Sequence, residues 1–212
     1  MKLYAISGTC SLAPHILLQY SGEPFELCLL DRDAGEQKSP QYKAINPRGK
    51  VPALEVDGDV ILENVAIQYY LASRFPALNL APAGLTARTR WLTFLTWCSN
   101  SVHPSFRRFR RPELHSPEPS AWPGVSEVGK QEFLAALREI DERLTEREWL
   151  FGDAFSTADA YVHVFHLWAL MAAFSIDDLS NLQRHGRTLM AMPAVQRAFD
   201  REKISRSVFG ED

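Results

Sequence analysis

The stretch of sequence that decides the fold is Asn46-Pro47-Arg48-Gly49-Lys50-Val51-Pro52-Ala53-Leu54. Pro52 falls at the start of an expected strand, although proline lacks the N–H group that a central strand needs for pairing. Proline does suit a tight turn, in which the peptide bond before it can be cis. We therefore predict a cis Val51–Pro52 bond. It would turn the N–H and C=O groups of Val51 away from the sheet, leaving them free to pair with the backbone of a bound peptide.

Glu63-Asn64 follows this stretch and should open the next helix. The N-terminus of a helix presents free N–H groups and the positive end of the helix dipole, and both favour a carboxylate ligand. An acidic residue is also common in the first helical turn for purely structural reasons. We favour a binding role because the turn at Pro52 precedes the helix start at short range. The two features together predict a site for a small peptide with a carboxylate group.

The segments around this stretch predict the order β-α-β-α-β-β-α over residues 1–75. Lys2–Ile6 is an expected strand, and Ser11 is a suitable N-cap for the helix that follows it. Phe25–Leu30 is expected to be a buried strand. Asp57-Gly58-Asp59 between apolar runs is a strong hairpin signal. The sequence therefore predicts a small α/β unit at the N-terminal end.

The second half of the chain has only helical periodicity. Apolar residues between Trp91 and Phe106 recur every three or four positions, which predicts one long helix. Pro112 to Gly124 contains four prolines and is expected to be a loop. Ser156 and Asp159 have the spacing of a capping box, with aspartate in place of the usual glutamate. We therefore expect an α/β domain at residues 1–76, a linker at 77–85 and an all-helical domain at 86–212.

The bulk properties exclude several classes of protein. The chain has 212 residues, 46% of them hydrophobic, and a net charge of −3, which gives no electrostatic argument for nucleic acid or an anionic membrane. Three cysteines do not form a disulfide framework and point to a reducing compartment. No apolar run approaches the ~20 residues of a membrane helix, and the first residues lack a signal-peptide pattern. We expect a cytoplasmic protein without a nucleic-acid or membrane partner.

Cys10 and His103 are the candidate catalytic residues. Cys10 lies between a strand and a helix start, and a helix N-terminus lowers the pKa of a cysteine. The alternative is a small buried residue, because free cysteine is among the most buried residue types. His103 is followed by Pro104, which should break a helical hydrogen bond and kink the helix. A lone helical histidine is also often structural, and the histidines and cysteines share no spacing that indicates a metal site.

These residues and motifs resemble the cytosolic glutathione transferase family over nearly the whole chain. The pairing of Cys10 with His103 is most similar to the bacterial beta class. The resemblance implies a thioredoxin-like N-terminal domain, followed by a helical domain, with a glutathione site in the cleft between them. It implies that Cys10 lies against the glutathione sulfur, where it can form a mixed disulfide, and that Ser11, the third catalytic candidate, donates to the thiolate. The glutathione contacts that it implies are Lys50, Val51, Pro52, Glu63, Asn64 and, less strongly, Thr96 and Lys38.

The sequence departs from the beta-class pattern at three of these places. Asn64 stands where the family has serine or glycine, Pro104 where it has lysine, and Thr96 where it has asparagine. These departures put in doubt how His103 is oriented and whether the site is catalytic. Four arginines, at positions 107, 108, 110 and 111, form a basic cluster that fits a solvated helix end. The cluster could alternatively attract an acidic co-substrate.

The resemblance implies an enzyme that conjugates or exchanges the glutathione thiol with a small hydrophobic electrophile. It also implies a homodimer, with glutathione as co-substrate and no other cofactor. Three alternatives remain open. The first is a glutathione-dependent disulfide reductase that uses Cys10 covalently, and the second is a glutathione-dependent isomerase or dehalogenase. The third is a non-catalytic protein that binds ligands or partners on the same fold.

Overall fold

The N-terminal part of the chain forms a four-stranded mixed sheet with three helices. The computed structural model describes residues 1–210. The strand order is β2-β1-β3-β4, with β1 parallel to β2 and antiparallel to β3, and β3 antiparallel to β4. The elements are β1 (Lys2–Ala5), α1 (Leu12–Ser21), β2 (Glu26–Leu29), α2 (Pro40–Ile45), β3 (Ala53–Val56), β4 (Asp59–Leu62) and α3 (Asn64–Arg74). This order confirms the predicted thioredoxin-like βαβαββα unit.

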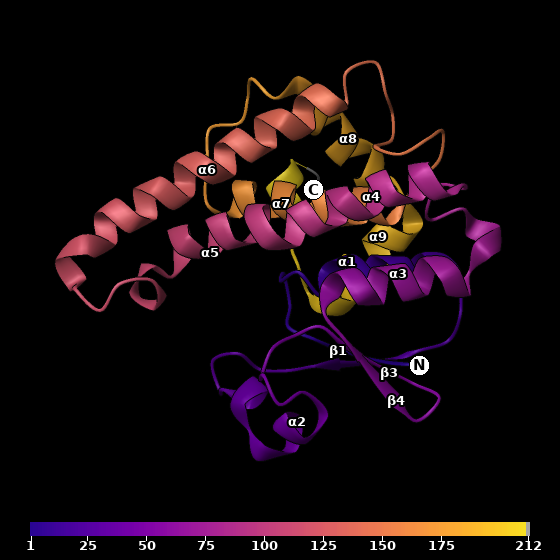
Figure 1. Ribbon diagram of the computed structural model, residues 1–212, viewed down its shortest axis with the longest axis horizontal. Coiled ribbons are helices and arrows are strands. Elements are labelled where there is room, and N and C mark those ends of the chain that lie inside the picture. Colours follow the sequence, from indigo (N-terminus) through magenta and orange to yellow (C-terminus); the bar gives the residue numbers. More distant parts are fainter. Residues whose placement is uncertain (211–212) are drawn as a thin grey trace.

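The sheet is covered on both faces, as Figure 1 shows. Alternate residues of β1 point to opposite faces, which is the period of a strand. Leu3 of β1 packs into the core that α1 and α3 share with the helical part, whereas Tyr4 packs against Tyr42 of α2. α1 also contacts α7 and α9. One continuous core therefore joins the sheet to the helices of the second half.

Two predictions for the sheet have different outcomes. The hairpin is confirmed, because Asp57 and Gly58 form its turn with φ values of 52° and 84°, as a two-residue hairpin turn requires. The prediction of a buried strand at Phe25–Leu30 is wrong. β2 is an edge strand, pairs only with β1 among residues 1–210, and leaves Leu29 37% exposed. Strand position within a sheet is set by topology, which local hydrophobicity does not report.

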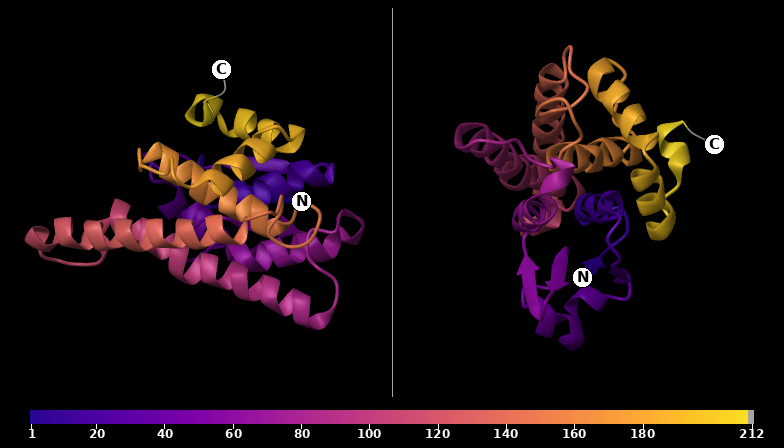
Figure 2. Two further views of the ribbon diagram at one scale, coloured as in Figure 1. Left: turned by 90° about the horizontal axis from the view of Figure 1, so that it is seen from above. Right: turned by 90° about the vertical axis from the view of Figure 1, so that its right-hand side faces the viewer.

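The second half of the described chain is helical, as predicted. Figure 2 shows α5 and α6 extending together beyond the other helices. Every residue from Thr157 to Ala169 is buried, so α7 is the central helix, and the predicted capping box joins Ser156 N to Asp159 Oδ2 at 2.8 Å. Its helices are α4 (Leu85–Trp97), α5 (His103–Arg110), α6 (Trp122–Arg143), α7 (Thr157–Met171), α8 (Ser180–Met190) and α9 (Pro193–Glu202).

The predicted long helix between residues 91 and 106 is interrupted. A π-helical turn, Cys98–Val102, separates α4 from α5, and Pro104 is the second residue of α5. Proline cannot donate the backbone hydrogen bond that a continuous α-helix needs at this position. π-turns within helices are frequent at functional sites. The break expected from Pro104 is therefore present as a change of helical register.

Other boundaries differ from the predictions. The proline-rich loop predicted for residues 112–124 ends early, since α6 begins at Trp122 and accommodates Pro123 in its first turn, where a missing N–H costs little. The ten residues 75–84 lie between α3 and α4. The assignment of residues 77–85 as a linker stays a prediction. The last two residues of the predicted second domain, 211–212, lie outside the described residues. Within residues 1–210, none of the helices is long and apolar enough to span a membrane.

Candidate functional site

The Val51–Pro52 peptide bond is cis, as the sequence predicts. Two hydrogen bonds fix the turn before this bond. The Lys50 carbonyl accepts them from the Tyr42 hydroxyl at 2.7 Å and from Asn46 Nδ2 at 2.6 Å. The Val51 carbonyl accepts a hydrogen bond from the Cys10 thiol, with Sγ at 3.7 Å, so the prediction that this carbonyl is left free is wrong. The Val51 N–H makes no hydrogen bond to any described residue. The turn therefore leaves one main-chain donor available for a ligand, directly beside Cys10.

The start of α3 is the second part of the candidate site. Glu63, the residue before α3, has a φ of 68°, a conformation that non-glycine residues adopt rarely and mostly at functional positions. Its exposed carboxylate is 3.2 Å from Arg48 Nη1. The backbone N–H of Asn64, the first residue of α3, has no partner within residues 1–210. This helix start therefore has the free N–H and dipole that the sequence analysis assigns to a carboxylate ligand.

The side chain of Asn64 has a different position from the one expected of a ligand-binding residue. It is buried, its Nδ2 donates to the Cys10 carbonyl at 2.8 Å, and its Oδ1 accepts from Gln68 Nε2 at 2.8 Å. These bonds connect α3 to the backbone of Cys10. The Asn64 side chain therefore positions Cys10, and only its backbone N–H faces the candidate site as a donor.

Cys10 is a buried thiol, 7% exposed, in the loop between β1 and α1. Burial raises the pKa of the Cys10 thiol to about 12, and the nearby Asn64 amide and backbone oppose this shift only in part. A helix N-terminus favours the thiolate, but here the cost of burying a charge is larger. Of the two interpretations that the sequence leaves open for Cys10, the structure therefore favours the small buried residue. Cys10 is a neutral S–H donor near pH 7.

Ser11 is fully buried, and its hydroxyl is used within the protein. Ser11 Oγ accepts from Ile6 N at 3.1 Å, is 3.2 Å from Ile6 O, and lies 2.8 Å from Thr9 Oγ1. It makes no capping hydrogen bond to α1, so the expected N-cap interaction is wrong. The hydroxyl instead fastens the Cys10 loop to the end of β1. A role as donor to a ligand thiolate is not supported by this geometry.

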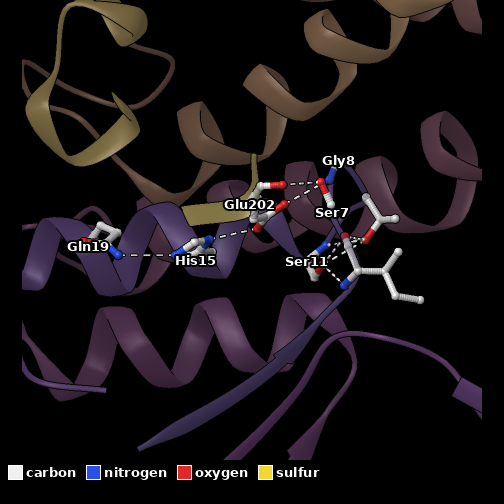
Figure 3. A network of polar contacts seen from close by, with 8 residues as sticks. Ser7, Gly8, Ser11, His15, Gln19 and Glu202 are labelled. Atoms are coloured by element: carbon white, nitrogen blue, oxygen red, sulfur yellow. Dashed lines mark hydrogen bonds and ion pairs between the residues drawn. The ribbon is translucent and has the colours of Figure 1, made fainter. Parts of the chain in front are cut away.

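A buried glutamate from the far end of the chain holds the same loop (Figure 3). Glu202, at the end of α9, is 2% exposed; its carboxylate accepts from Gly8 N at 2.9 Å and its carbonyl from Ser7 Oγ at 2.7 Å. Its other carboxylate oxygen is 2.8 Å from His15 Nδ1. Sequence reasoning missed Glu202, because an acidic residue near the end of an amphipathic helix has no local signal of burial. This contact fixes the Cys10 loop relative to the helical half.

His103 contacts the Cys10 loop indirectly, through Trp168. The His103 ring packs edge-on against Trp168 at a centroid distance of 4.9 Å, and Trp168 Nε1 donates to the Gly8 carbonyl at 2.8 Å. Burial, followed by the positive charges of Arg107 and Lys50, lowers the pKa of His103 to about 4. The imidazole is therefore neutral near pH 7. The charges of Arg107 and Lys50 thus act against protonation of the His103 ring.

Thr96 and Lys38 are not brought into contact with the other candidates. Lys38 is exposed in a 3-10 turn, Glu36–Lys38, and Thr96 is exposed on α4. The spacing of seven residues between Thr96 and His103 predicts one shared helical face. The wider π-turn at Cys98–Val102 lies between them and rotates the two positions apart. Their roles stay predictions.

The expected cleft between the two domains also stays a prediction. Two hollows, of about 1020 and 460 Å³, lie beside α4 and α6. The larger is lined by aromatic residues that include Phe94, Trp97 and Phe151. Neither is lined by a candidate glutathione-site residue. Across residues 1–210, no group of three or more His, Cys, Asp or Glu side chains is arranged to hold a metal ion.

A thioredoxin-like sheet with a cis-proline turn, a free main-chain donor and a neighbouring cysteine defines a class of thiol-peptide-binding proteins. Comparison with known sequences gives the family. The profile "Glutathione S-transferase, N-terminal domain" matches residues 1–73. "Glutathione S-transferase GST-4.5" of Xanthomonas campestris pv. campestris is 35% identical over 97% of this chain and 100% of that protein. The chain therefore belongs to the glutathione S-transferase family.

Other curated relatives show the range of the family. Glutathione S-transferase GstA of Escherichia coli O157:H7 is 32% identical, over 96% of this chain and 100% of that protein. A protein of Pseudomonas aeruginosa named maleylacetoacetate isomerase is 31% identical, over 94% of this chain and 90% of its own length. The enzyme class expected from the sequence, a glutathione transferase, is confirmed.

Solved structures agree with this assignment. A glutathione S-transferase from Xylella fastidiosa has a TM-score of 0.89 at 32% identity, covering 96% of this chain and 99% of its own. A sphingomonad glutathione S-transferase in complex with glutathione has a TM-score of 0.85 at 31% identity, covering 97% and 100%. A beta-class enzyme from Sphingomonas chungbukensis has a TM-score of 0.86 at 29% identity, covering 97% and 100%. The resemblance to the beta class is thereby confirmed.

Proposed function

We propose that this protein binds glutathione at the Val51 turn and the start of α3, and transfers its sulfur to a small electrophile. The observation that carries the proposal is the free Val51 N–H beside the Cys10 thiol, on a turn that Tyr42 and Asn46 hold in place. The peptide backbone of glutathione would pair with Val51. A carboxylate of glutathione would lie at the helix start, near the backbone N–H of Asn64.

The side chains of Lys50, Lys38 and Glu63 would complete the glutathione contacts. Lys50 is exposed beside the Val51 turn and has no ion-pair partner in the described chain, so it suits the glycine carboxylate. Lys38 could serve the same carboxylate from its neighbouring turn. Glu63 would attract the ammonium group of glutathione, as an exposed carboxylate at the other end of the site. Replacement of Lys50 by alanine should raise KM for glutathione and leave kcat almost unchanged.

In the proposed mechanism, neutral donors stabilise the glutathione thiolate. The Cys10 S–H and an N–H of the neutral His103 ring would donate to the ligand sulfur, which favours loss of its proton to solvent. The thiolate then attacks the electrophilic carbon, a C–S bond forms, and the leaving group departs with its electron pair. Bringing the pKa of the thiol toward neutrality is the main catalytic contribution.

The role of Cys10 separates conjugation from covalent exchange. Thiol–disulfide exchange needs a thiolate, and burial keeps Cys10 protonated near pH 7. We therefore expect the Cys10→Ala variant to conjugate 1-chloro-2,4-dinitrobenzene at a reduced rate, with glutathione binding retained in calorimetry. Complete loss of conjugation together with loss of glutathione-dependent disulfide reduction would favour the reductase. Binding of glutathione without turnover of any electrophile or disulfide by the unmodified protein would favour a non-catalytic function.

A glutathione-dependent isomerase is the second candidate function. The relative from Pseudomonas aeruginosa that is named maleylacetoacetate isomerase supports it. Such a reaction needs the thiolate to add to a double bond and to leave again, so that no glutathione is consumed. Monitoring glutathione consumption across a panel of electrophiles and unsaturated dicarbonyl compounds distinguishes conjugation from isomerisation. We also propose that the protein is a cytoplasmic homodimer. Light scattering after gel filtration tests the oligomeric state.

A further inference from the structure

The arginine cluster at residues 107–111 divides into two pairs with different surroundings. Arg108 forms an ion pair with Glu132 of α6, and Arg111 forms one with Glu113. Arg107 and Arg110 are exposed and have no ion-pair partner among residues 1–210. Two cations of the cluster are thus neutralised by the protein itself, and two are left for solvent or a ligand.

The two unpaired arginines lie on the helical face that begins with His103. Residues 103, 106, 107 and 110 of α5 have the spacing i, i+3, i+4 and i+7, which places them on one side of a helix. Phe106 stacks on Trp168 at 4.8 Å, and His103 meets the same ring edge-on. The opposite side of α5 is occupied, since Ser105 and Arg108 pack against Gly129 of α6. Arg107 and Arg110 therefore lie on the side of α5 that also carries His103 and Phe106. These two residues contact Trp168, which donates a hydrogen bond to the loop before Cys10.

We propose that the electrophile taken by this site carries a carboxylate, which pairs with Arg107, and an apolar body, which lies along the partly exposed ring of Phe106. This inference rests on the proposed function, because it assigns the second substrate of the same reaction. A guanidinium group binds a carboxylate through two parallel hydrogen bonds, and an aromatic ring supplies a flat apolar surface; Trp168, which is buried, supports the Phe106 ring from behind. Lys50 is assigned to glutathione, so Arg107 is the cation acting on His103 that is left for the second substrate. Arg110 is a second, more distant contact.

The spacing along α5 sets the size of the electrophile. Four residues rise about 6 Å along a helix, which separates the backbone positions of His103 and Arg107. The reacting carbon near the glutathione sulfur and the carboxylate should therefore be separated by about the width of one aromatic ring. The probe 4-chloro-3,5-dinitrobenzoate has this arrangement. In its reaction a C–S bond forms at the carbon that carries chlorine, the C–Cl bond breaks, chloride leaves with the electron pair, and the thiol proton goes to solvent.

The test compares 4-chloro-3,5-dinitrobenzoate with its methyl ester, which has the same reacting carbon and no charge. We measure kcat/KM for both electrophiles with the unchanged protein, Arg107→Gln and the control Arg108→Gln. Loss of a charge-assisted contact should lower kcat/KM of Arg107→Gln for the acid about tenfold. The change for the ester should stay below about twofold. Arg108→Gln removes the same charge one residue away and should change neither value appreciably. KM for glutathione should stay unchanged in both variants.

Equal losses for acid and ester in Arg107→Gln, or equal losses in both variants for the acid, would overturn the proposal. Binding of the two reaction products, S-(4-carboxy-2,6-dinitrophenyl)glutathione and its methyl ester, is measured by calorimetry as a readout that needs no turnover. Arg107→Gln should weaken binding of the acid product selectively, and this effect should shrink as salt is added. If the unchanged protein turns over neither electrophile, the proposed conjugation fails. Equal weakening of both products in Arg107→Gln, or no weakening of either, removes the carboxylate site.

Discussion

Replacement of Glu202 by glutamine tests whether a buried carboxylate holds the Cys10 loop to the helical half. Gln19 Nε2 lies 3.3 Å from His15 Nε2, so that ring nitrogen accepts, and Nδ1 carries the proton directed at Glu202. The two carboxylate oxygens of Glu202 therefore each face a donor, His15 Nδ1–H at 2.8 Å and Gly8 N–H at 2.9 Å. Glutamine keeps one acceptor and places an NH2 group against the other donor.

The magnitude follows from these two contacts. A hydrogen bond to a charged group contributes about 1.5–3 kcal/mol, and a buried donor without a partner costs about 1–3 kcal/mol. Removing a charge from a buried position offsets part of this loss of stability, because the desolvation of the carboxylate no longer opposes folding. We expect Glu202→Gln to lower the free energy of unfolding by about 2–4 kcal/mol. For a chain of this size that is roughly 5–15 °C in Tm.

Urea unfolding followed by circular dichroism measures this change, with Asp200→Asn as the matched control. Asp200 lies on the same helix and makes only an exposed ion pair with Arg206 at 3.6 Å. Its replacement should change stability by less than about 0.5 kcal/mol. KM for glutathione should rise in Glu202→Gln, because Ser7 and Gly8 position the Cys10 loop. Equal stability of the two variants would refute the assignment of the carboxylate as the link between the halves.

Three further predictions concern the candidate site. Burial raises the pKa of the Cys10 thiol to about 12, so alkylation of Cys10 by iodoacetamide at pH 7.5 should be far slower than that of a free thiol. Mass spectrometry measures this rate, and rapid alkylation would contradict a protonated thiol. The pKa of His103 is lowered to about 4, so its ring is neutral above about pH 5 and should show no NMR titration between pH 6 and 8. For the same reason the folded state should lose stability as pH falls below about 6.5, the pKa of this histidine in the unfolded chain. Tyr42→Phe removes the 2.7 Å hydrogen bond to the Lys50 carbonyl and should raise KM for glutathione about fivefold, or ~1 kcal/mol, with kcat little changed; an unchanged KM would separate this turn from ligand binding.

The fold could be predicted from the sequence because its main signals are local. Pro52, the Asp57-Gly58 turn and the Ser156–Asp159 capping box each specify a backbone conformation within a few residues, and all three have the predicted structure. The failures concern features set by distant parts of the chain. β2 is an edge strand because of sheet order, which the apolar character of its residues does not encode.

The same distinction explains the outcome at the candidate site. Ser11 and Asn64 are polar residues at helix starts, and sequence reasoning gives such residues caps or ligands. The structure uses both side chains to fix the Cys10 loop, because Ile6 and the Cys10 carbonyl offer them buried partners. The same burial decides between the two interpretations that the sequence leaves open for Cys10 and makes it a neutral thiol. Glu202 is 192 residues from Cys10 in the sequence, and only the packing of α9 on α1 brings it to the loop.

The protonation states of the candidate site have one consistent chemical meaning. Cys10 is buried and His103 is half-buried, and both are held in their neutral forms, so each can offer a hydrogen to a ligand sulfur without bringing a charge of its own. Lys50 and Arg107 lie near enough to lower the pKa of His103, and the same positive field favours an anion between them. Burial is the larger cause of the His103 shift, and burial opposes a thiolate as well; only the contribution of the two cations favours ionisation of a thiol placed there. The proposed stabilisation of the glutathione thiolate therefore rests on these cations and on the neutral hydrogen-bond donors, and it works against the cost of burial.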